Sequence, residues 1–421
     1  MKTMNILILG GGRSAKWLIN KLAAEAGDDQ RLTVADSSKP AFLQEGPYVH
    51  YLGIDAADEE ELEDAIAGKQ VCVSLLPPAL HLEVAKVCLR HQVHFVSASY
   101  QSEEIKNLDD EAKEDGIVIL SECGLDPGID HVTALQALLR IKAEGGKVLK
   151  FQSHCGGLPA ETHTNDWGYK FFWNPMNVVL AGADGAKLLQ EGKEVIVPYS
   201  SIFAEANPLK MDGKADGEYV WYPNRDSVAY IDHYRLEGMQ DFVRGTIRGS
   251  RFCGFWAELV HMGITNNVHH FGKQGGKERL ADFVEQGKLE RASSLAKRLL
   301  EEEIDSTNAT LASKLLKVLT KLWTPGPADL DTVLMVHKIG YETEGGESRT
   351  YVFEMEEVGT NEASAMSHLV GLPIYLFIES LQAGHKYPSG SLTPSHESVQ
   401  PVLFAGLLEA GLKMEELDFA S

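Results

Sequence analysis

The sequence predicts an α/β fold, in which an N-terminal domain built on a parallel, doubly wound sheet precedes a mixed-sheet α+β domain with a small helical insert. Three observations support this prediction. Strand-like and helix-like segments alternate through about the first 130 residues. A run of glycines stands between the first apolar segment and the first amphipathic one. From about Lys147 the pattern changes to strand-like runs separated by loops rich in Gly, Pro and Asn.

Short apolar runs mark the predicted strands of the N-terminal domain. They lie at residues 4–9, 32–35, 48–52, 71–76, 94–97 and 117–120, with amphipathic segments at 13–26, 58–67, 80–91 and 103–115. Strands that alternate with helices of about 10–15 residues indicate a parallel sheet. The run at the N-terminus lacks the small-residue cleavage site of a signal peptide, so we interpret it as a strand.

The second domain is predicted from strand-like runs and from one long helical stretch. Strands are expected at 148–154, 194–198, 218–222, 241–248, 332–339 and 349–356, and helices at 363–383 and 398–411. Charged and apolar residues recur at helical spacing through residues 277–323, which predicts a helical insert. The predicted domains are residues 1–132 plus about 390–421 (dinucleotide-binding), residues 133–275 plus 326–389 (α+β) and residues 276–325 (insert).

Composition narrows the class of protein. The chain has 421 residues and a formal net charge of −22 at pH 7, and it contains no apolar run long enough for a transmembrane helix. An acidic surface repels phosphate backbones and anionic lipids, so neither nucleic acid nor a membrane is an expected partner. The five cysteines are odd in number and show no CxxC spacing. We therefore expect reduced thiols in a cytoplasmic protein, with no metal bound.

The glycine run has the spacing of a dinucleotide-binding turn. Gly10 permits a tight turn, Gly12 lets the backbone approach a pyrophosphate, and Ala15 allows the helix to pack closely on the strand. The N–H groups at the helix N-terminus then attract phosphate. A GxGxxA pattern alone is a weak signal, but here it lies between a strand and a helix. The sequence therefore predicts a Rossmann domain that binds a nicotinamide dinucleotide, with its phosphates held by Gly10, Gly12, Arg13 and Ser14.

Asp36 ends the second predicted strand, and Ser37 follows it. An acidic side chain at this position accepts hydrogen bonds from the ribose hydroxyls of NAD, whereas the 2′-phosphate of NADP is repelled by it and favours an arginine. No arginine stands beside Asp36, and Lys39 is the nearest cation. A solvated turn residue is the alternative interpretation. We expect NAD or NADP as the cofactor, with NAD favoured by Asp36.

Ligands of doubly wound folds bind at the carboxyl ends of the strands. Asp55, after the third predicted strand, is expected beside the adenine, and the segment after the fourth strand beside the nicotinamide half. Loop composition alone is an alternative explanation for both. The further residues expected to contact the cofactor are Ser74, Leu75, Leu76, Pro77, Ala98, Leu125, Asp126, Pro127 and Gly128.

Five sequence blocks carry a resemblance to a known family. They are GLDPGID at 124–130, CGGLPAE at 155–161, YKFFW at 169–173, YPNRDS at 222–227 and RGTIR at 244–248. Through these blocks the chain resembles the saccharopine reductase family, the L-glutamate-forming saccharopine dehydrogenases, over nearly its whole length. It departs from the family at Ser37, where an NADP-type arginine is usual, at Ala160, where a second proline is missing, and at Met176, where some members have an arginine.

The resemblance implies an activity. It is the NAD(P)-dependent interconversion of saccharopine with L-glutamate and L-2-aminoadipate 6-semialdehyde, a reaction of lysine metabolism. The expected partner is therefore a small tricarboxylate amino acid. The resemblance also implies a homodimer, and a C-terminal helix that returns to pack on the dinucleotide-binding domain.

Several residues suit a substrate with three carboxylates, because a guanidinium binds a carboxylate through two hydrogen bonds. Arg225 is the first candidate for one carboxylate, and Thr246 with Arg248 for another. A structural or surface role is the alternative for each arginine. The predicted substrate-binding residues are Ser99, Tyr100, Asp126, Arg225, Arg244, Thr246, Ile247 and Arg248.

Tyr100, Asp126 and Cys155 are the candidate catalytic residues. Asp126 can orient the secondary amine of the substrate or relay its proton. It can equally cap the helix that begins near Ile129. Cys155 stands beside two glycines, so it can approach the reacting carbon or pass a proton, and a buried neutral thiol is the alternative.

Two other functions stay open. A carboxynorspermidine-type imine reductase of polyamine synthesis belongs to the same superfamily, but its cationic substrate needs a pocket lined by carboxylates. The arginines at positions 225, 244 and 248 fit a tricarboxylate better. A cofactor-sensing regulatory or assembly protein would keep the Rossmann domain without catalysis, and the presence of Asp126, Arg225 and Thr246 argues against it.

Overall fold

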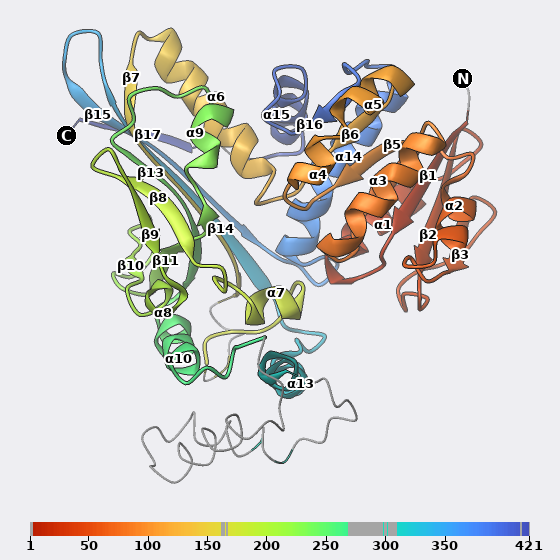
Figure 1. Ribbon diagram of the computed structural model, residues 1–421, viewed down its shortest axis with the longest axis horizontal. Helices are drawn as coiled ribbons and strands as arrows, with labels where there is room; N and C mark the ends of the chain where they lie inside the picture. The colour runs from red at the N-terminus through yellow and green to blue at the C-terminus, as the bar shows by residue number, and fades with distance from the viewer. Residues whose placement is uncertain are drawn as a thin grey trace. The chain divides into compact units, whose positions relative to one another are not determined.

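The computed structural model describes residues 3–160, 165, 167–267, 298, 301, 310–412 and 415–420. The chain forms two compact units. The first contains Met1–Arg140 and Glu362–Lys413, and the second contains Ile141–Asn361 and Met414–Ser421. The predicted α/β fold, with a parallel sheet in the N-terminal domain and a mixed sheet in the second, is confirmed (Figure 1).

In the described part of the first unit, seven strands form one sheet in which every neighbouring pair is parallel. Their order is β16-β6-β5-β4-β1-β2-β3. The chain moves outward from β1 in one direction through β2 and β3, and in the other through β4. The carboxyl ends of β1 and β4 therefore form the switch point where such sheets bind dinucleotides. The strands are β1 (Met4–Leu9), β2 (Gln30–Asp36), β3 (Val49–Gly53), β4 (Val71–Ser74), β5 (His94–Ser97), β6 (Val118–Leu120) and β16 (Gly390–Leu392).

Helices pack on this sheet through apolar faces. The helix after β3 begins at Asp58, whose carboxylate accepts hydrogen bonds from the N–H groups of Glu60 and Glu61. The helix before β16 packs on α1 where Gly371 lies against Trp17 and Leu18, so a larger residue would force the two helices apart. The helices that begin in this unit are η1 (Arg13–Ala15), α1 (Lys16–Ala24), α2 (Glu59–Ile66), η2 (Pro78–Leu80), α3 (His81–Arg90), α4 (Glu103–Lys106), α5 (Asp109–Asp115), α6 (Ile129–Ala143), α14 (Ala365–Gln382) and α15 (Gln400–Glu409).

The second unit contains a mixed sheet, with ten strands in its described part. The main path is β10-β11-β13-β7-β14-β15-β17, and β8, β9 and β12 lie off it. β13 runs parallel to β7, whereas β11 pairs antiparallel with β13 and β14 pairs antiparallel with β7. The strands are β7 (Lys147–Pro159), β8 (Ala186–Gln190), β9 (Lys193–Val197), β10 (Asn207–Pro208), β11 (Tyr219–Pro223), β12 (Arg225–Asp226), β13 (Asp241–Gly249), β14 (Asp331–Glu342), β15 (Ser348–Val358) and β17 (Glu415–Ala420).

Aromatic side chains form much of the core of the second unit. Trp256 and Trp323 are fully buried, with ring centroids 6.0 Å apart, and Phe252 stacks on Trp256 at 5.1 Å. Contacts between rings add to the stabilisation that comes from burying their apolar area. The helices of this unit are α7 (Pro175–Val179), α8 (Tyr199–Ile202), α9 (Ala229–His233), α10 (Ser250–His261) and α13 (Leu311–Trp323).

The observed units differ from the predicted domains in two places. Helix α14, predicted in the second domain, belongs to the first unit because it packs on α1. Strand β17, predicted in the first domain, pairs with β15 and belongs to the second unit. Most of the predicted insert at 276–325 lies outside the described residues, and α13 within it packs into the aromatic core of the second unit.

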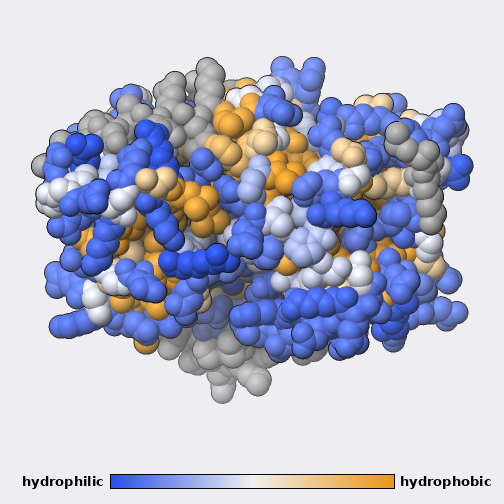
Figure 2. All heavy atoms as spheres, turned by 90° about the horizontal axis from the view of Figure 1, so that it is seen from above, coloured by the Kyte–Doolittle hydropathy of each residue, from blue (hydrophilic) through white to orange (hydrophobic). Residues whose placement is uncertain are grey.

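Hydrophilic side chains predominate on the face shown in Figure 2, and apolar ones lie there in scattered groups. Within the described residues, the helices are too short or too polar to span a bilayer.

Candidate functional site

The glycine turn after β1 has the geometry of a phosphate-binding turn. Gly10 has a φ of +95°, and a Cβ at this residue would lie 2.9 Å from the carbonyl oxygen of Leu75. A Cβ at Gly12 would meet nothing within 4 Å, so the space beside this residue is open. No side chain caps the first turn of η1. The N–H groups of that turn are therefore suited to bind a phosphate, and the turn fits a dinucleotide.

Arg13 and Ser14 lie in η1, where Arg13 is exposed and Ser14 is half-buried. Close to this turn, Oδ2 of Asp36 accepts a hydrogen bond from the N–H of Gly11 at 2.7 Å. Its other oxygen accepts one from the hydroxyl of Ser37 at 3.3 Å, and Ser37 is exposed. The Asp36 carboxylate therefore ties the end of β2 to the glycine turn.

The predicted contacts that follow β3 and β4 lie in turns, whereas Ser74 is buried at the end of β4. Oδ1 of Asp55 accepts a hydrogen bond from the N–H of Ala57 at 3.0 Å, as a turn residue does. A contact between Asp55 and adenine stays a prediction. After β4, Leu75 and Leu76 are half-buried and Pro77 is exposed.

A buried histidine, which the sequence analysis did not single out, joins the ends of β4 and β5. Nδ1 of His81 lies 2.8 Å from Oγ of Ser74, and its Nε2 lies 2.8 Å from Oγ of Ser99. Burial lowers the pKa of His81 to about 4, so the imidazole is neutral at pH 7. Ser74 and Ser99 were predicted separately, as cofactor and substrate residues, and the structure links them through one ring.

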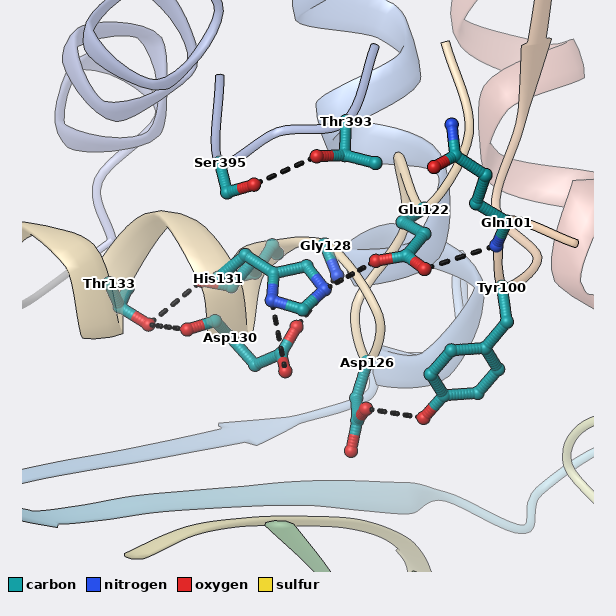
Figure 3. Close-up of polar contacts among 11 residues, drawn as sticks. Tyr100, Gln101, Glu122, Asp126, Gly128, Asp130, His131, Thr133, Thr393 and Ser395 are labelled. Carbon is teal, nitrogen blue, oxygen red and sulfur yellow. Dashed lines mark hydrogen bonds and ion pairs between the residues drawn. The ribbon is translucent and has the colours of Figure 1, made fainter. Parts of the chain in front are cut away.

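Tyr100 and Asp126 come together in the first unit (Figure 3). The hydroxyl of Tyr100 donates a hydrogen bond to Oδ1 of Asp126 at 3.1 Å, and both residues are half-buried. Tyr100 follows β5, and Asp126 lies in the loop before α6. A phenol paired with a carboxylate is able to exchange a proton with an amine ligand.

The loop that carries Asp126 is tightly folded. A Cβ at Gly128, whose φ is +146°, would clash with the carbonyl oxygen of Gly124. A Cβ at Gly124 would lie 2.8 Å from that of Ala98. The N–H of Gly128 donates to Oδ1 of Asp130 at 2.7 Å, so Asp130 takes part in capping α6, a role that the sequence analysis considered for Asp126. The predicted residues Ala98, Leu125, Asp126, Pro127 and Gly128 therefore gather at the ends of β5 and β6.

Three buried polar residues lie beside this loop: Glu122, Asp130 and His131. Nε2 of His131 lies 2.8 Å from Oε2 of Glu122. No functional role was predicted for these three residues, although they lie in the same segment, 122–131, as Asp126. Among the described residues, no group of three or more His, Cys, Asp and Glu side chains is placed to hold a metal ion.

In the second unit, the structure brings four predicted residues together. Arg244, Thr246 and Arg248 alternate along β13, so their side chains lie on one face of the sheet. Thr246 is the register partner of Cys155 on β7 and of Tyr222 on β11. The arginines and Cys155 are buried, whereas Thr246 is half-buried.

The guanidinium of Arg248 is held by aromatic rings. Its Cζ lies 5.3 Å from the ring centroid of Tyr169 and 5.9 Å from that of Trp173, and the side chain is only 3% exposed. Nη1 donates a hydrogen bond to the carbonyl oxygen of Ile247 at 2.8 Å. Nε of Arg248 is buried and has no hydrogen-bond partner among the described residues. A carboxylate would supply that partner.

The remaining predicted substrate residues are placed differently. Arg225 is exposed on β12 with a φ of +52°, whereas the sequence analysis placed it first among the arginines. Cζ of Arg244 lies 4.2 Å from the ring centroid of Tyr230. The side chain of Ile247 points to the opposite face from Arg248, because neighbouring strand residues alternate. Arg248 and Arg244 are buried beside aromatic rings, so they are better candidates for substrate binding than Arg225 and Ile247.

Two family profiles match the chain. Residues 6–120 match a profile described as Saccharopine dehydrogenase NADP binding domain. Residues 124–410 match one described as Saccharopine dehydrogenase C-terminal domain. The border between the two matches, at residues 121–123, lies between the end of β6 and Asp126.

Individual relatives agree with these profiles. The chain is 30% identical to a saccharopine dehydrogenase [NADP(+), L-glutamate-forming] from Pyricularia oryzae, with 99% of each chain covered. Its structure is similar to that of apo saccharopine dehydrogenase (L-Glu forming) from Saccharomyces cerevisiae, with a TM-score of 0.82, 28% identity and 99% and 100% of the two chains covered. It is also 28% identical to the mitochondrial alpha-aminoadipic semialdehyde synthase of Bos taurus, over 94% of this chain and 46% of that protein.

The comparisons support a nicotinamide cofactor, but not the predicted preference for NAD. The matched profile and the Pyricularia relative both carry NADP in their names, and the Asp36 carboxylate is already engaged by Gly11. The second profile spans well over half of the chain, and the resemblance carried by the five sequence blocks is confirmed. The protein is a member of the saccharopine dehydrogenase family.

Proposed function

We propose that this protein is an NAD(P)-dependent oxidoreductase that interconverts saccharopine with L-glutamate and L-2-aminoadipate 6-semialdehyde. The observation that supports this most directly is similarity to an L-glutamate-forming saccharopine dehydrogenase over 99% of both chains. A buried arginine pair on one face of the second unit's sheet agrees with a substrate that carries several carboxylates.

The reaction acts on a carbon–nitrogen bond. In the oxidative direction, saccharopine loses a hydride and a proton to become an imine, and water then adds to the imine carbon. The bond from that carbon to nitrogen breaks, so glutamate leaves with the nitrogen and the carbon becomes an aldehyde. When bound, the cofactor serves as the hydride acceptor. The protein's own residues have to hold the carboxylates, accept the amine proton and transfer protons during hydrolysis.

Tyr100 and Asp126 are the proposed proton-transfer pair. Asp126 can accept the proton of the secondary amine, and the Tyr100 hydroxyl, which donates to Asp126, can stabilise the carboxylate or pass the proton on. Cys155 is a weaker candidate, because it is buried on β7. Its proximity to Thr246 is compatible with a contact to the substrate.

Arg248 and Arg244 are the proposed carboxylate ligands, with Thr246 between them. The aromatic contacts of Arg248 hold the guanidinium in place, and its unpartnered Nε can donate to a carboxylate oxygen. Arg225 is exposed, so we assign it at most a peripheral contact.

The glycine turn and the strand ends of the first unit would hold the cofactor, and the names of the relatives favour NADP. The absence of an arginine beside Asp36 leaves the 2′-phosphate without its usual partner. We therefore propose that the protein accepts both cofactors, with NADP preferred.

A cytoplasmic location and a homodimer complete the proposal. The five cysteines are all buried and form no disulfide, as a reducing compartment allows. Light scattering coupled to size-exclusion chromatography tests the dimer, and a monomeric mass at micromolar concentration would exclude it.

Steady-state kinetics with the purified protein test the proposed activity. Saccharopine is supplied with NADP or NAD, and formation of the reduced cofactor is followed by absorbance. Glutamate and an aldehyde should appear in amounts equal to the reduced cofactor. Carboxynorspermidine serves as the comparison substrate. Turnover of carboxynorspermidine, with none of saccharopine under either cofactor, would refute the proposal.

A further inference from the structure

The buried polar cluster of Glu122, Asp130 and His131 lies beside the loops that carry Tyr100 and Asp126 (Figure 3). Glu122 is 4% exposed, Asp130 1% and His131 0%. Buried ion pairs add little net stability, because the cost of removing charges from water offsets their attraction. Such a cluster can instead fix the geometry of the backbone segments to which it is bonded.

Glu122 holds the backbone on both sides of Tyr100. Its N–H donates a hydrogen bond to the carbonyl oxygen of Ser99 at 2.9 Å. Its Oε1 accepts one from the N–H of Gln101 at 3.0 Å. Glu122 itself has a φ of +62°, a conformation that non-glycine residues rarely adopt. In this conformation both the N–H and the side chain of Glu122 reach the segment 99–101.

Asp130 holds the backbone around Asp126 in the same manner. Its N–H donates a hydrogen bond to the carbonyl oxygen of Leu125 at 3.1 Å. Its Oδ1 accepts one from the N–H of Gly128 at 2.7 Å. Glu122 therefore bonds to the backbone on both sides of Tyr100, and Asp130 bonds to the backbone on both sides of Asp126. Each acidic residue uses its own N–H and its carboxylate.

His131 lies next to the carboxylates of both Glu122 and Asp130. Nε2 lies 2.8 Å from Oε2 of Glu122, and Nδ1 lies 3.9 Å from Oδ2 of Asp130. The first contact is a hydrogen bond, whereas the second is too long to be one, so the imidazole is bonded to the Glu122 carboxylate and stands beside the carboxylate of Asp130, its neighbour in the chain. A shift of this ring would move one loop relative to the other.

We propose that His131, through Glu122 and Asp130, is a positioning residue that sets the separation between the Tyr100 hydroxyl and the Asp126 carboxylate. The inference deepens the proposed function and rests on it, because the pair is assigned there to proton transfer. His131 does not touch the substrate. Its effect reaches the reaction through the geometry of the two loops.

The kinetic test uses the full-length enzyme with His131→Phe, His131→Gln and Glu122→Gln. His131→Phe removes both ring nitrogens, whereas His131→Gln keeps one amide that can bond to Glu122. We expect His131→Phe to lower kcat about tenfold or more with KM for saccharopine within about twofold, and His131→Gln to recover part of the loss. Thr133→Val on the same helix is the matched control, because it removes a buried hydroxyl that donates to the main-chain carbonyl oxygens of Ile129 and Asp130.

A double-mutant cycle separates positioning from general damage. If His131 acts through Asp126, His131→Phe should cost little further kcat in an Asp126→Asn background, about threefold or less. An equal fold-loss in both backgrounds, or a loss that falls on KM, would overturn the proposal. If His131→Phe shows no cooperative thermal transition, the same test is made with Glu122→Gln. Its loss should fall on kcat and should be smaller in the Asp126→Asn background.

A structural measurement gives an answer that does not depend on saccharopine turnover. In a crystal structure of Glu122→Gln, the distance between Oη of Tyr100 and Oδ1 of Asp126 is compared with 3.1 Å. Loss of this hydrogen bond supports the positioning role, and an unchanged distance overturns it. A wild-type enzyme inactive on saccharopine would refute the proposed function alone, because the distance is still measurable.

Discussion

The carboxylate of Asp36 accepts a hydrogen bond from the N–H of Gly11 at 2.7 Å. This contact joins the end of β2 to the glycine turn, and both segments line the dinucleotide site of a Rossmann domain. The side chain therefore has two separable effects. It holds the turn by accepting a hydrogen bond, and its negative charge opposes a 2′-phosphate.

Asp36→Asn and Asp36→Ala separate the two effects. Asparagine keeps an oxygen that can accept from Gly11 but removes the charge, so the ratio of kcat/KM for NADP to that for NAD should rise about tenfold. Alanine should raise the ratio similarly and also lower the free energy of unfolding by about 1–2 kcal/mol. Steady-state kinetics and urea unfolding measure the two quantities. An unchanged cofactor ratio in Asp36→Asn would show that this charge does not face the ribose.

Gly10 and Gly12 should respond differently to alanine. A Cβ at Gly10 meets the Leu75 carbonyl at 2.9 Å and the backbone has a φ of +95°, so Gly10→Ala should destabilise the folded protein by about 1–2 kcal/mol. A Cβ at Gly12 meets nothing within 4 Å, so Gly12→Ala should fold normally. It should nevertheless raise the Kd for NADPH about tenfold, because the methyl group occupies the space of the pyrophosphate.

Thermal unfolding and fluorescence titration with NADPH check the glycine pair. If Gly12→Ala binds NADPH as tightly as the wild-type protein, the pyrophosphate does not pass over this residue. The assignment of the phosphate site to the turn would then be wrong.

Most strands of the first unit were predictable because parallel strands are buried on both faces, whereas β16 was not predicted as a strand. The apolar run at 71–76, for example, contains β4 (Val71–Ser74), whose four residues are all buried. The Tyr100–Asp126 pair was predictable for another reason. Both residues follow strands of the parallel sheet, and the ends of such strands meet at one edge.

Other features depend on tertiary contacts that no local pattern encodes. His81 links Ser74 to Ser99 through both ring nitrogens, and a single histidine near the start of a helix gives no sequence signal of that role. The sequence also gives no signal of which arginines are buried. Arg225 was the first candidate from the sequence, whereas Arg248 is buried in the structure and Arg225 is exposed. Helix α14 is apolar on several sides, so its partner α1 was not predictable from its pattern.

Arg248 should be the most sensitive of the arginines in substrate binding. Arg248→Lys keeps the charge but loses the planar group that stacks on Tyr169 and donates in two directions. We expect KM for saccharopine to rise by the equivalent of about 2–3 kcal/mol, with a much smaller change for the cofactor.

Arg225→Lys is the matched control for this prediction, because Arg225 is exposed and the same atoms change. Its KM for saccharopine should change by less than about threefold. If Arg225→Lys raises KM for saccharopine as much as Arg248→Lys does, or more, the preference for Arg248 as the carboxylate ligand is wrong. The measurement is a saccharopine titration at saturating cofactor.

His81 should make the stability of the protein depend on pH in a defined window. In the folded state, burial lowers the pKa of His81 to about 4, from an ordinary value of 6.5. Between these two values the unfolded chain binds more protons than the folded one, so stability rises with pH across the window. The contribution is complete above about pH 6.5 and is lost as the pH falls toward 4, by about 3 kcal/mol in total. His81→Gln has no group that titrates there, so its free energy of unfolding should fall less than that of the wild-type protein between pH 7 and about pH 4.5. Urea unfolding at the two pH values measures the difference, and equal losses in both proteins would mean that the imidazole is not held neutral between Ser74 and Ser99.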